Sequence, residues 1–259
     1  MKEDMVINHH GREVFASLFY PENGGVHRKP LVIISHGFGG CGSDHEWMAA
    51  ELNQRGIACC CFDFCGGGNR SRSSLNTEQM TIFTEKEDLT AVLEEMEKRP
   101  QIDCQRIFLF GESQGGLVTA LVAEEQRDHV SGMILLYPAL CIPDDWQKRY
   151  PDLGEVPETL EWWDVNLSRR FVETIHDFHV FEEIGNYPGR VLLMHGGKDP
   201  VVPIAYTQKA FTRYQNAEYR IFPEEGHGFS MEAARRMFDE VVLFIASIAG
   251  TSFLSARLT

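Results

Sequence analysis

The chain has 259 residues, of which 43% are hydrophobic and 24% are charged, with a formal net charge of −14. This is the composition of an ordinary globular protein. The acidic balance argues against a nucleic-acid partner, which needs a basic face, and against anionic membranes. No apolar run approaches the roughly 18 residues of a membrane span, and no apolar signal segment follows the charged N-terminus. Four of the seven cysteines lie within residues 59–65, so we expect reduced thiols and a cytoplasmic protein.

The first half of the chain alternates between apolar runs with strand character and amphipathic segments with helical spacing. The expected elements are strands at 5–9 and 13–20, a turn at 21–25, a strand at 31–35, a helix at 44–55, a strand at 57–62 and a glycine-rich loop at 66–83. Thr84 is then predicted to cap a helix, because Glu87 follows three residues later as in a capping box. Pro100 closes that helix, and a strand at 106–110 follows.

A G-x-S-x-G pentapeptide directly follows this strand and opens a helical segment. Gly111-Glu112-Ser113-Gln114-Gly115 in that context predicts a nucleophile elbow, a sharp turn that presents a serine hydroxyl at the edge of a sheet. The glycines leave room for the strained backbone of the serine. The alternative is a chance match in a chain with 23 glycines. The surrounding strand and helix favour the nucleophile.

Residues 139–188 interrupt the alternation with prolines, many charges and several aromatic residues. On either side of this segment the pattern continues, with strands at 132–137, 191–194 and 218–222 and helices at 204–214 and 231–248. Strands that alternate with helices predict an α/β fold, a mostly parallel central sheet with helices on both faces. We expect a core made of residues 1–138 and 189–259, with 139–188 inserted as a lid. In such sheets ligands bind at the carboxyl ends of the strands.

Two later loops supply the partners that a serine nucleophile needs. Asp199 follows the strand at 191–194, and His227 follows the strand at 218–222. The order Ser113, Asp199, His227 is that of an α/β-hydrolase triad, in which histidine takes the serine proton and the acid holds its tautomer. Asp199 could instead cap the helix after Pro203, and His227 could be an exposed loop histidine. Glu224 and Glu225 are rival acids, but they lie too close to His227 along the chain.

The oxyanion of an acyl-transfer intermediate needs prepositioned N–H donors. One donor is expected from the amide of Gln114, the residue after the nucleophile. The other is expected from the amide of Phe38, in the loop that follows the strand at 31–35. Asp63 is expected to fix its own loop through hydrogen bonds from its side chain to the backbone.

These motifs together resemble the bacterial cinnamoyl (feruloyl) esterases of the α/β-hydrolase superfamily, over nearly the whole chain. The resemblance lies in His36-Gly37-Phe38, Phe62-Asp63-Phe64, the elbow with Gly116, and the insertion. It implies the triad and the two amides assigned above, and an aromatic acid held under the insertion. By resemblance, Phe171 and Asp145 match lid residues that contact the phenolic hydroxyl of that acid, and Trp146, one of the aromatic residues of the insertion, is a further candidate for substrate binding. Phe171 stands where the family has a tyrosine, and Glu112 stands where those esterases more often carry histidine.

We therefore expect a serine carboxylic-ester hydrolase that forms an acyl-enzyme, on small aromatic, hydroxycinnamate-like esters. The alternatives are an acyl-peptidase or thioesterase on the same scaffold, or a non-catalytic ligand-binding protein. No cofactor and no metal are expected. The adjacent residues Cys59, Cys60 and Cys61 suit a buried strand, and no second cluster of ligands complements them to form a zinc site. The expected partner is a small-molecule ester, with no nucleic acid and no membrane, and the sequence is compatible with a homodimer.

Overall fold

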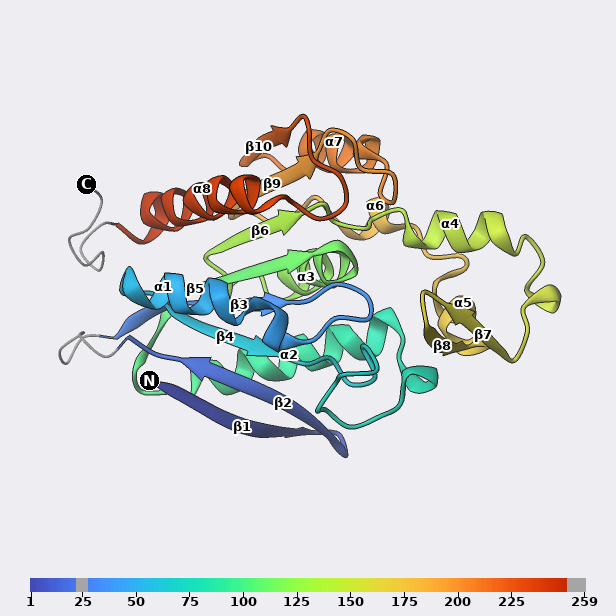
Figure 1. Ribbon diagram of the computed structural model, residues 1–259, viewed down its shortest axis with the longest axis horizontal. Helices are drawn as coiled ribbons and strands as arrows, with labels where there is room; N and C mark the ends of the chain where they lie inside the picture. The colour runs from blue at the N-terminus through green and yellow to red at the C-terminus, as the bar shows by residue number, and fades with distance from the viewer. Residues whose placement is uncertain (22–27, 251–259) are drawn as a thin grey trace.

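Eight strands form the central sheet of the protein, seen here in a computed structural model that describes residues 1–21 and 28–250 (Figure 1). Their order across the sheet is β1-β2-β4-β3-β5-β6-β9-β10. The strands are β1 Lys2–His9, β2 Arg12–Phe19, β3 Lys29–Ser35, β4 Ala58–Phe62, β5 Ile102–Glu112, β6 Gly132–Leu136, β9 Arg190–Gly196 and β10 Ala217–Phe222. The turn predicted at 21–25 falls almost entirely outside the described residues.

The sheet is mostly parallel, as the sequence predicts. β1 pairs with β2 and β2 with β4 in antiparallel fashion, and every other neighbouring pair in the sheet is parallel. β3, β4 and β6 are buried along their whole length, which explains their continuous apolar runs. Side chains of β4 alternate between the two faces: Cys59 and Cys61 pack into one core and Cys60 into the other.

Helices cover both faces of the sheet (Figure 1). Buried side chains of α1 (Glu46–Gln54) and α8 (Met231–Ala249) form the core on one face, and those of α2 (Ile82–Glu97), α3 (Ser113–Glu125) and α7 (Ile204–Arg213) contribute to the other. None of the helices described is both long enough and apolar enough to cross a bilayer.

Two details of the predicted helices are wrong. Helix α2 begins at Ile82, so its N-cap is Thr81 rather than Thr84. Thr81 Oγ1 accepts the Thr84 amide at 3.1 Å, and Thr84 Oγ1 accepts the Thr81 amide at 2.8 Å. The box therefore closes with a threonine instead of Glu87, and the helix gains a turn that buries Ile82. The helix expected from residue 44 starts with a short 3-10 turn, η1 (Gly42–His45), and the loop at 66–83 contains another, η2 (Thr77–Gln79).

Residues 139–188, called the insertion below, lie beyond the carboxyl ends of the parallel strands (Figure 1). They form α4 (Ile142–Arg149), η3 (Leu153–Glu155), the antiparallel pair β7 (Thr159–Trp162) and β8 (Val165–Ser168), α5 (Arg169–Ile175) and α6 (Val180–Glu183). Two hydrogen bonds fasten the hairpin to the glycine-rich loop region: Asn69 Nδ2 donates to the Asp164 carbonyl at 2.8 Å, and Thr77 Oγ1 donates to the Asn166 carbonyl at 2.6 Å.

Candidate active site

Ser113 lies at the junction of β5 and α3 with a backbone φ of +51°. L-residues rarely adopt this left-handed conformation, so the surrounding packing must hold it. The flanking glycines allow that packing. A Cβ atom on Gly111 would lie 2.3 Å from the Gly115 carbonyl oxygen, and one on Gly115 would lie 2.3 Å from the His36 carbonyl oxygen. The turn therefore has the strained, closely packed geometry of a nucleophile elbow.

Ser113, His227 and Asp199 form one continuous hydrogen-bonded chain. Ser113 Oγ lies 2.9 Å from His227 Nε2, and His227 Nδ1 lies 2.9 Å from Asp199 Oδ2. Because a carboxylate only accepts, Nδ1 carries the proton and Nε2 is free to accept from the serine. The three residues come from loops that follow β5, β10 and β9, so the parallel sheet brings them to one edge.

The Asp199 carboxylate is fully buried and is fixed by its own turn. Its Oδ1 accepts the amides of Val201 at 2.8 Å and Val202 at 2.9 Å, which leaves Oδ2 directed at His227. Asp199 does not cap α7, which begins at Ile204 after Pro203.

A second histidine lies beside the acid. His195 Nε2 donates to the Val202 carbonyl at 3.1 Å and lies 3.4 Å from Asp199 Oδ2, and its Nδ1 accepts from Thr207 Oγ1 at 2.8 Å. Burial lowers the pKa of His195, so a neutral ring packs behind Asp199. His195 was not predicted from the sequence, although a histidine within the apolar run of a buried strand was a signal.

The loop that carries Phe38 packs directly against the elbow. A Cβ atom on Gly37 would lie 3.2 Å from Ser113 Cβ. His36 Nδ1 donates to the Gly37 carbonyl at 2.8 Å, and Nε2 accepts the Phe64 amide at 3.1 Å. Burial lowers the pKa of His36, which keeps the ring in this neutral tautomer. Phe38 and Gln114 both line the cavity at Ser113, so the structure places the two expected oxyanion residues beside the nucleophile.

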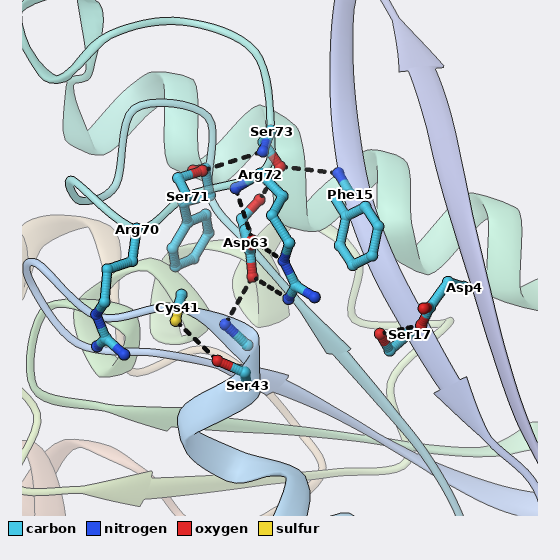
Figure 2. Close-up of polar contacts among 12 residues, drawn as sticks. Asp4, Phe15, Ser17, Cys41, Ser43, Asp63, Arg70, Ser71, Arg72 and Ser73 are labelled. Atoms are coloured by element: carbon cyan, nitrogen blue, oxygen red, sulfur yellow. Dashed lines mark hydrogen bonds and ion pairs between the residues drawn. The ribbon is translucent and has the colours of Figure 1, made fainter.

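Asp63 holds its own loop in place, as predicted, and also reaches the segment that follows β3 (Figure 2). Its Oδ1 accepts the Gly42 amide at 2.8 Å, and its Oδ2 accepts the Arg72 amide and the Arg72 Nε, both at 2.8 Å. Burial opposes ionisation, but the Arg72 guanidinium and the two amides keep the pKa of Asp63 below its ordinary value. The carboxylate therefore joins the loops that follow β3 and β4 beside the site.

A cavity of about 350 Å³ opens at Ser113 between the core and the insertion. The insertion residues expected to bind substrate, Asp145, Trp146 and Phe171, all line it. The Trp146 ring centroid lies 5.2 Å from that of Trp162 and 5.9 Å from that of Phe171. Several further lining residues were not predicted from the sequence: Cys141, Ile142, Arg149, Trp162, Trp163 and Leu167. Asp145 and Arg149 are the charged side chains in an otherwise mostly apolar lining.

Two buried carboxyl groups lie behind Gln114. Gln114 Nε2 donates to Glu85 Oε2 at 2.9 Å, and Asp88 follows one turn later on α2. Burial raises the pKa of Glu85 well above its ordinary value and that of Asp88 to about 6. A carboxyl whose pKa is raised by folding lowers stability as the pH rises above its unfolded-state pKa, because the folded protein must hold a proton or bury a charge.

Glu85→Gln is therefore expected to stabilise the protein at pH 8 by about 1–3 kcal/mol, the usual desolvation penalty of a buried polar group. The amide imitates the neutral acid, so the gain should open as the pH rises above the ordinary glutamate value of 4.5 and vanish below it. Urea unfolding at pH 4 and pH 8 measures it. Glu94→Gln, an exposed position on α2, is the control. A variant less stable than wild type at pH 8 would contradict the reasoning.

Comparison with known proteins agrees with this geometry. The family described as serine aminopeptidase, S33, matches residues 26–184. A structure titled "Ferulic Acid bound to Est1E from Butyrivibrio proteoclasticus" is 28% identical, with a TM-score of 0.84 over 94% of this chain and 99% of that chain.

Two sequence relatives are more distant. Monoglyceride lipase of Rattus norvegicus is 26% identical over 136 residues, 52% of this chain and 42% of the lipase, so the match spans less than half of that protein. An uncharacterised protein of Mycobacterium tuberculosis is 25% identical over 223 residues, 85% of this chain and 71% of its own. With its elbow, its mostly parallel sheet and a family match over more than half of its length, the chain belongs to the serine aminopeptidase S33 family and has the α/β-hydrolase fold.

Proposed function

We propose that the protein is a serine carboxylic-ester hydrolase that works through an acyl-enzyme. The observation that carries the proposal is the unbroken chain from Ser113 Oγ through His227 to the buried Asp199, at distances of 2.9 and 2.9 Å. A serine hydroxyl is a weak nucleophile by itself, and this arrangement gives it both a base and a residue that orients the base. It lies at the foot of a cavity that can hold an acyl group.

In this mechanism His227 Nε2 takes the proton of Ser113 as Oγ attacks the ester carbonyl carbon. The backbone amides of Phe38 and Gln114 stabilise the oxyanion of the tetrahedral intermediate. The intermediate collapses, His227 gives its proton to the leaving alcohol, and Ser113 is left acylated. A water molecule then attacks the acyl carbon with His227 as base, and collapse of the second intermediate releases the acid and restores the serine hydroxyl.

The acyl group that suits the cavity best is small and aromatic. Trp146, Trp162 and Phe171 give it flat apolar walls, and its volume of about 350 Å³ lies at the small end of ligand pockets. A carboxylate, Asp145, and a guanidinium, Arg149, are available to a polar ring substituent. The structural relative with ferulic acid bound supports the same choice. We therefore propose hydroxycinnamate-like esters as substrates.

A panel of substrates tests this proposal. We expect kcat/KM for methyl ferulate and methyl caffeate to exceed that for methyl acetate by about 10- to 100-fold, the effect of burying an aromatic ring. Asp145→Asn should reduce kcat/KM for methyl ferulate by about 10-fold, the worth of a hydrogen bond to a charged group. Methyl cinnamate, which lacks the phenolic hydroxyl, is the matched control and should be unaffected. A flat profile across these esters would contradict the aromatic specificity.

The same panel should include thioesters and aminoacyl amides, because the triad geometry serves every acyl transfer and the matched family is described as an aminopeptidase. Preferred cleavage of an aminoacyl amide would make the protein an acyl-peptidase. Failure of a fluorophosphonate probe to label Ser113 would favour a non-catalytic binding protein.

A further inference from the structure

Glu112, the last residue of β5, is joined to three other segments of the active-site wall. Its Oε2 accepts from Tyr137 Oη at 3.2 Å, and its Oε1 accepts from the Gly37 amide at 3.4 Å. His45 Nε2 lies 3.3 Å from the same Oε1 as an ion pair. The carboxylate is not among the residues that line the cavity. Glu112 therefore contacts other residues of the active-site wall and does not face the substrate cavity.

Each of these contacts leads to a different part of the proposed machinery. Gly37 immediately precedes Phe38, whose amide is the proposed oxyanion donor. The Tyr137 ring centroid lies 4.7 Å from that of the His227 imidazole. Tyr137 is held in a left-handed conformation with φ of +35°, and its amide donates to the Met194 carbonyl at 2.7 Å. One carboxylate is thus connected to the oxyanion loop and to the base, and it is the chain neighbour of Ser113.

The surroundings keep this carboxylate ionised. Burial raises its pKa, but the facing His45 and the hydrogen bonds from Tyr137 and Gly37 outweigh burial and hold the pKa of Glu112 below its ordinary value. Burial would lower the pKa of His45, but Glu112, with smaller contributions from Cys61 and Asp44, raises it. The other titratable groups near this pair are His36, beside His45, and Asp199, beside Tyr137. An ionised carboxylate accepts stronger hydrogen bonds than a protonated carboxyl group does.

We propose that Glu112 is a positioning residue of the hydrolase: its carboxylate fixes the Gly37–Phe38 backbone and the Tyr137 ring, and through them the oxyanion donor and His227. This inference rests on the proposed function. It also explains why both carboxylate oxygens are needed. The two donors face different oxygens, so a glutamine in the same position, with one acceptor oxygen and one donor nitrogen, could accept from only one of them.

The test compares Glu112→Gln with wild type on a p-nitrophenyl ester. We expect kcat to fall by about 10- to 100-fold, less than the loss of a whole oxyanion donor, which costs about 10²–10³. KM should change by less than about 3-fold, because binding in the cavity is untouched and the lost interaction acts in the transition state. Glu112→Asp, which keeps the charge and both oxygens, should recover part of the lost kcat.

Glu124→Gln is the matched control, since Glu124 is another carboxylate whose oxygens accept backbone amides, those of Gly185 and Asn186. It should lower the melting temperature without changing kcat per folded molecule. If Glu112→Gln does the same, the role of Glu112 is only structural and the inference is overturned.

A second variant tests the role of Glu112 if Glu112→Gln folds poorly. Tyr137→Phe removes only the hydroxyl that donates to Glu112, and should lower kcat by about 10-fold, the lower end expected for one hydrogen bond to a charged group. An unchanged kcat in this variant would remove the proposed link to His227. Failure of the underlying function looks different, because then wild type itself would neither turn over esters nor react with a fluorophosphonate.

Discussion

Ser113→Ala is expected to lower kcat for a p-nitrophenyl ester by about 10⁶-fold, to the level left by binding and the oxyanion hole alone. The reason is geometric: Ser113 Oγ is the atom that lies 2.9 Å from His227 Nε2, and alanine leaves the base with no hydroxyl to deprotonate. Alanine has no bulk to clash in the turn, so the fold should persist. Steady-state kinetics with purified variant, supported by circular dichroism, would measure the loss.

Covalent labelling makes this prediction specific. A fluorophosphonate should modify wild type at Ser113 and leave Ser113→Ala unmodified. Ser131→Ala is the matched control, because Ser131 Oγ donates to the Gln105 carbonyl at 2.8 Å, just before β6 and far along the strand from the elbow. It should retain full activity and labelling. Turnover that survives in Ser113→Ala would show that another residue is the nucleophile, and would remove the basis of the proposed mechanism.

The parts of the fold that could be predicted are those in which burial leaves a local pattern. A strand covered on both faces must be apolar throughout. β3 and β4, with its cysteines, could therefore be predicted from the sequence. The β7–β8 hairpin has no continuous apolar run, because buried and exposed residues alternate along its two four-residue strands. It is a small pair whose outward residues, Glu161 and Asn166, are exposed. Its turn uses Trp163 and Asp164 at positive φ instead of the asparagine–glycine pair that marks such turns.

The start of α2 shows a different limit. Thr81 and Thr84 both offer a hydroxyl three residues before a polar side chain, so the local pattern allowed two N-caps. The choice is made by packing, because starting at Ile82 buries that side chain in the core. The free energy gained by burying the extra turn of α2 outweighs a difference between the two N-caps, since one N-cap contributes only about 1 kcal/mol.

The active site, too, has a part that could be predicted from the sequence and a part that could not. Ser113, Asp199 and His227 each sit in a loop directly after a strand, and the parallel topology alone predicts that such loops meet. The environment of Glu112 could not be inferred, because its partners Tyr137 and Gly37 are 25 and 75 residues away along the chain. Which side chains meet there depends on the register of β5 against β3 and β6, and a sequence pattern does not carry register between strands.

The second large effect is expected from Asp199→Asn, which should lower kcat by about 10⁴-fold with little change in fold, as the loss of the correct histidine tautomer does in serine proteases. Oδ1 of Asp199 accepts two backbone amides, from Val201 and Val202. The asparagine oxygen must take that position, since an amide nitrogen there would face two donors. Its NH₂ group then points at His227 Nδ1, so Nδ1 becomes an acceptor, the ring proton moves to Nε2, and Nε2 cannot receive the proton of Ser113.

The control for this variant is Asp152→Asn, because Asp152 Oδ1 also accepts a backbone amide, that of Gly154, at 2.8 Å, but Asp152 lies in the insertion and outside the triad. It should keep wild-type kcat. A loss of less than about 10-fold in Asp199→Asn would mean that tautomer control by this acid is not needed. The neighbouring acids could not explain such a result: Glu225 accepts the Ser230 amide and hydroxyl at 2.6 and 2.8 Å, and Glu224 is paired with Lys198. With both rivals engaged elsewhere, the effect of this single substitution measures how far His227 depends on Asp199.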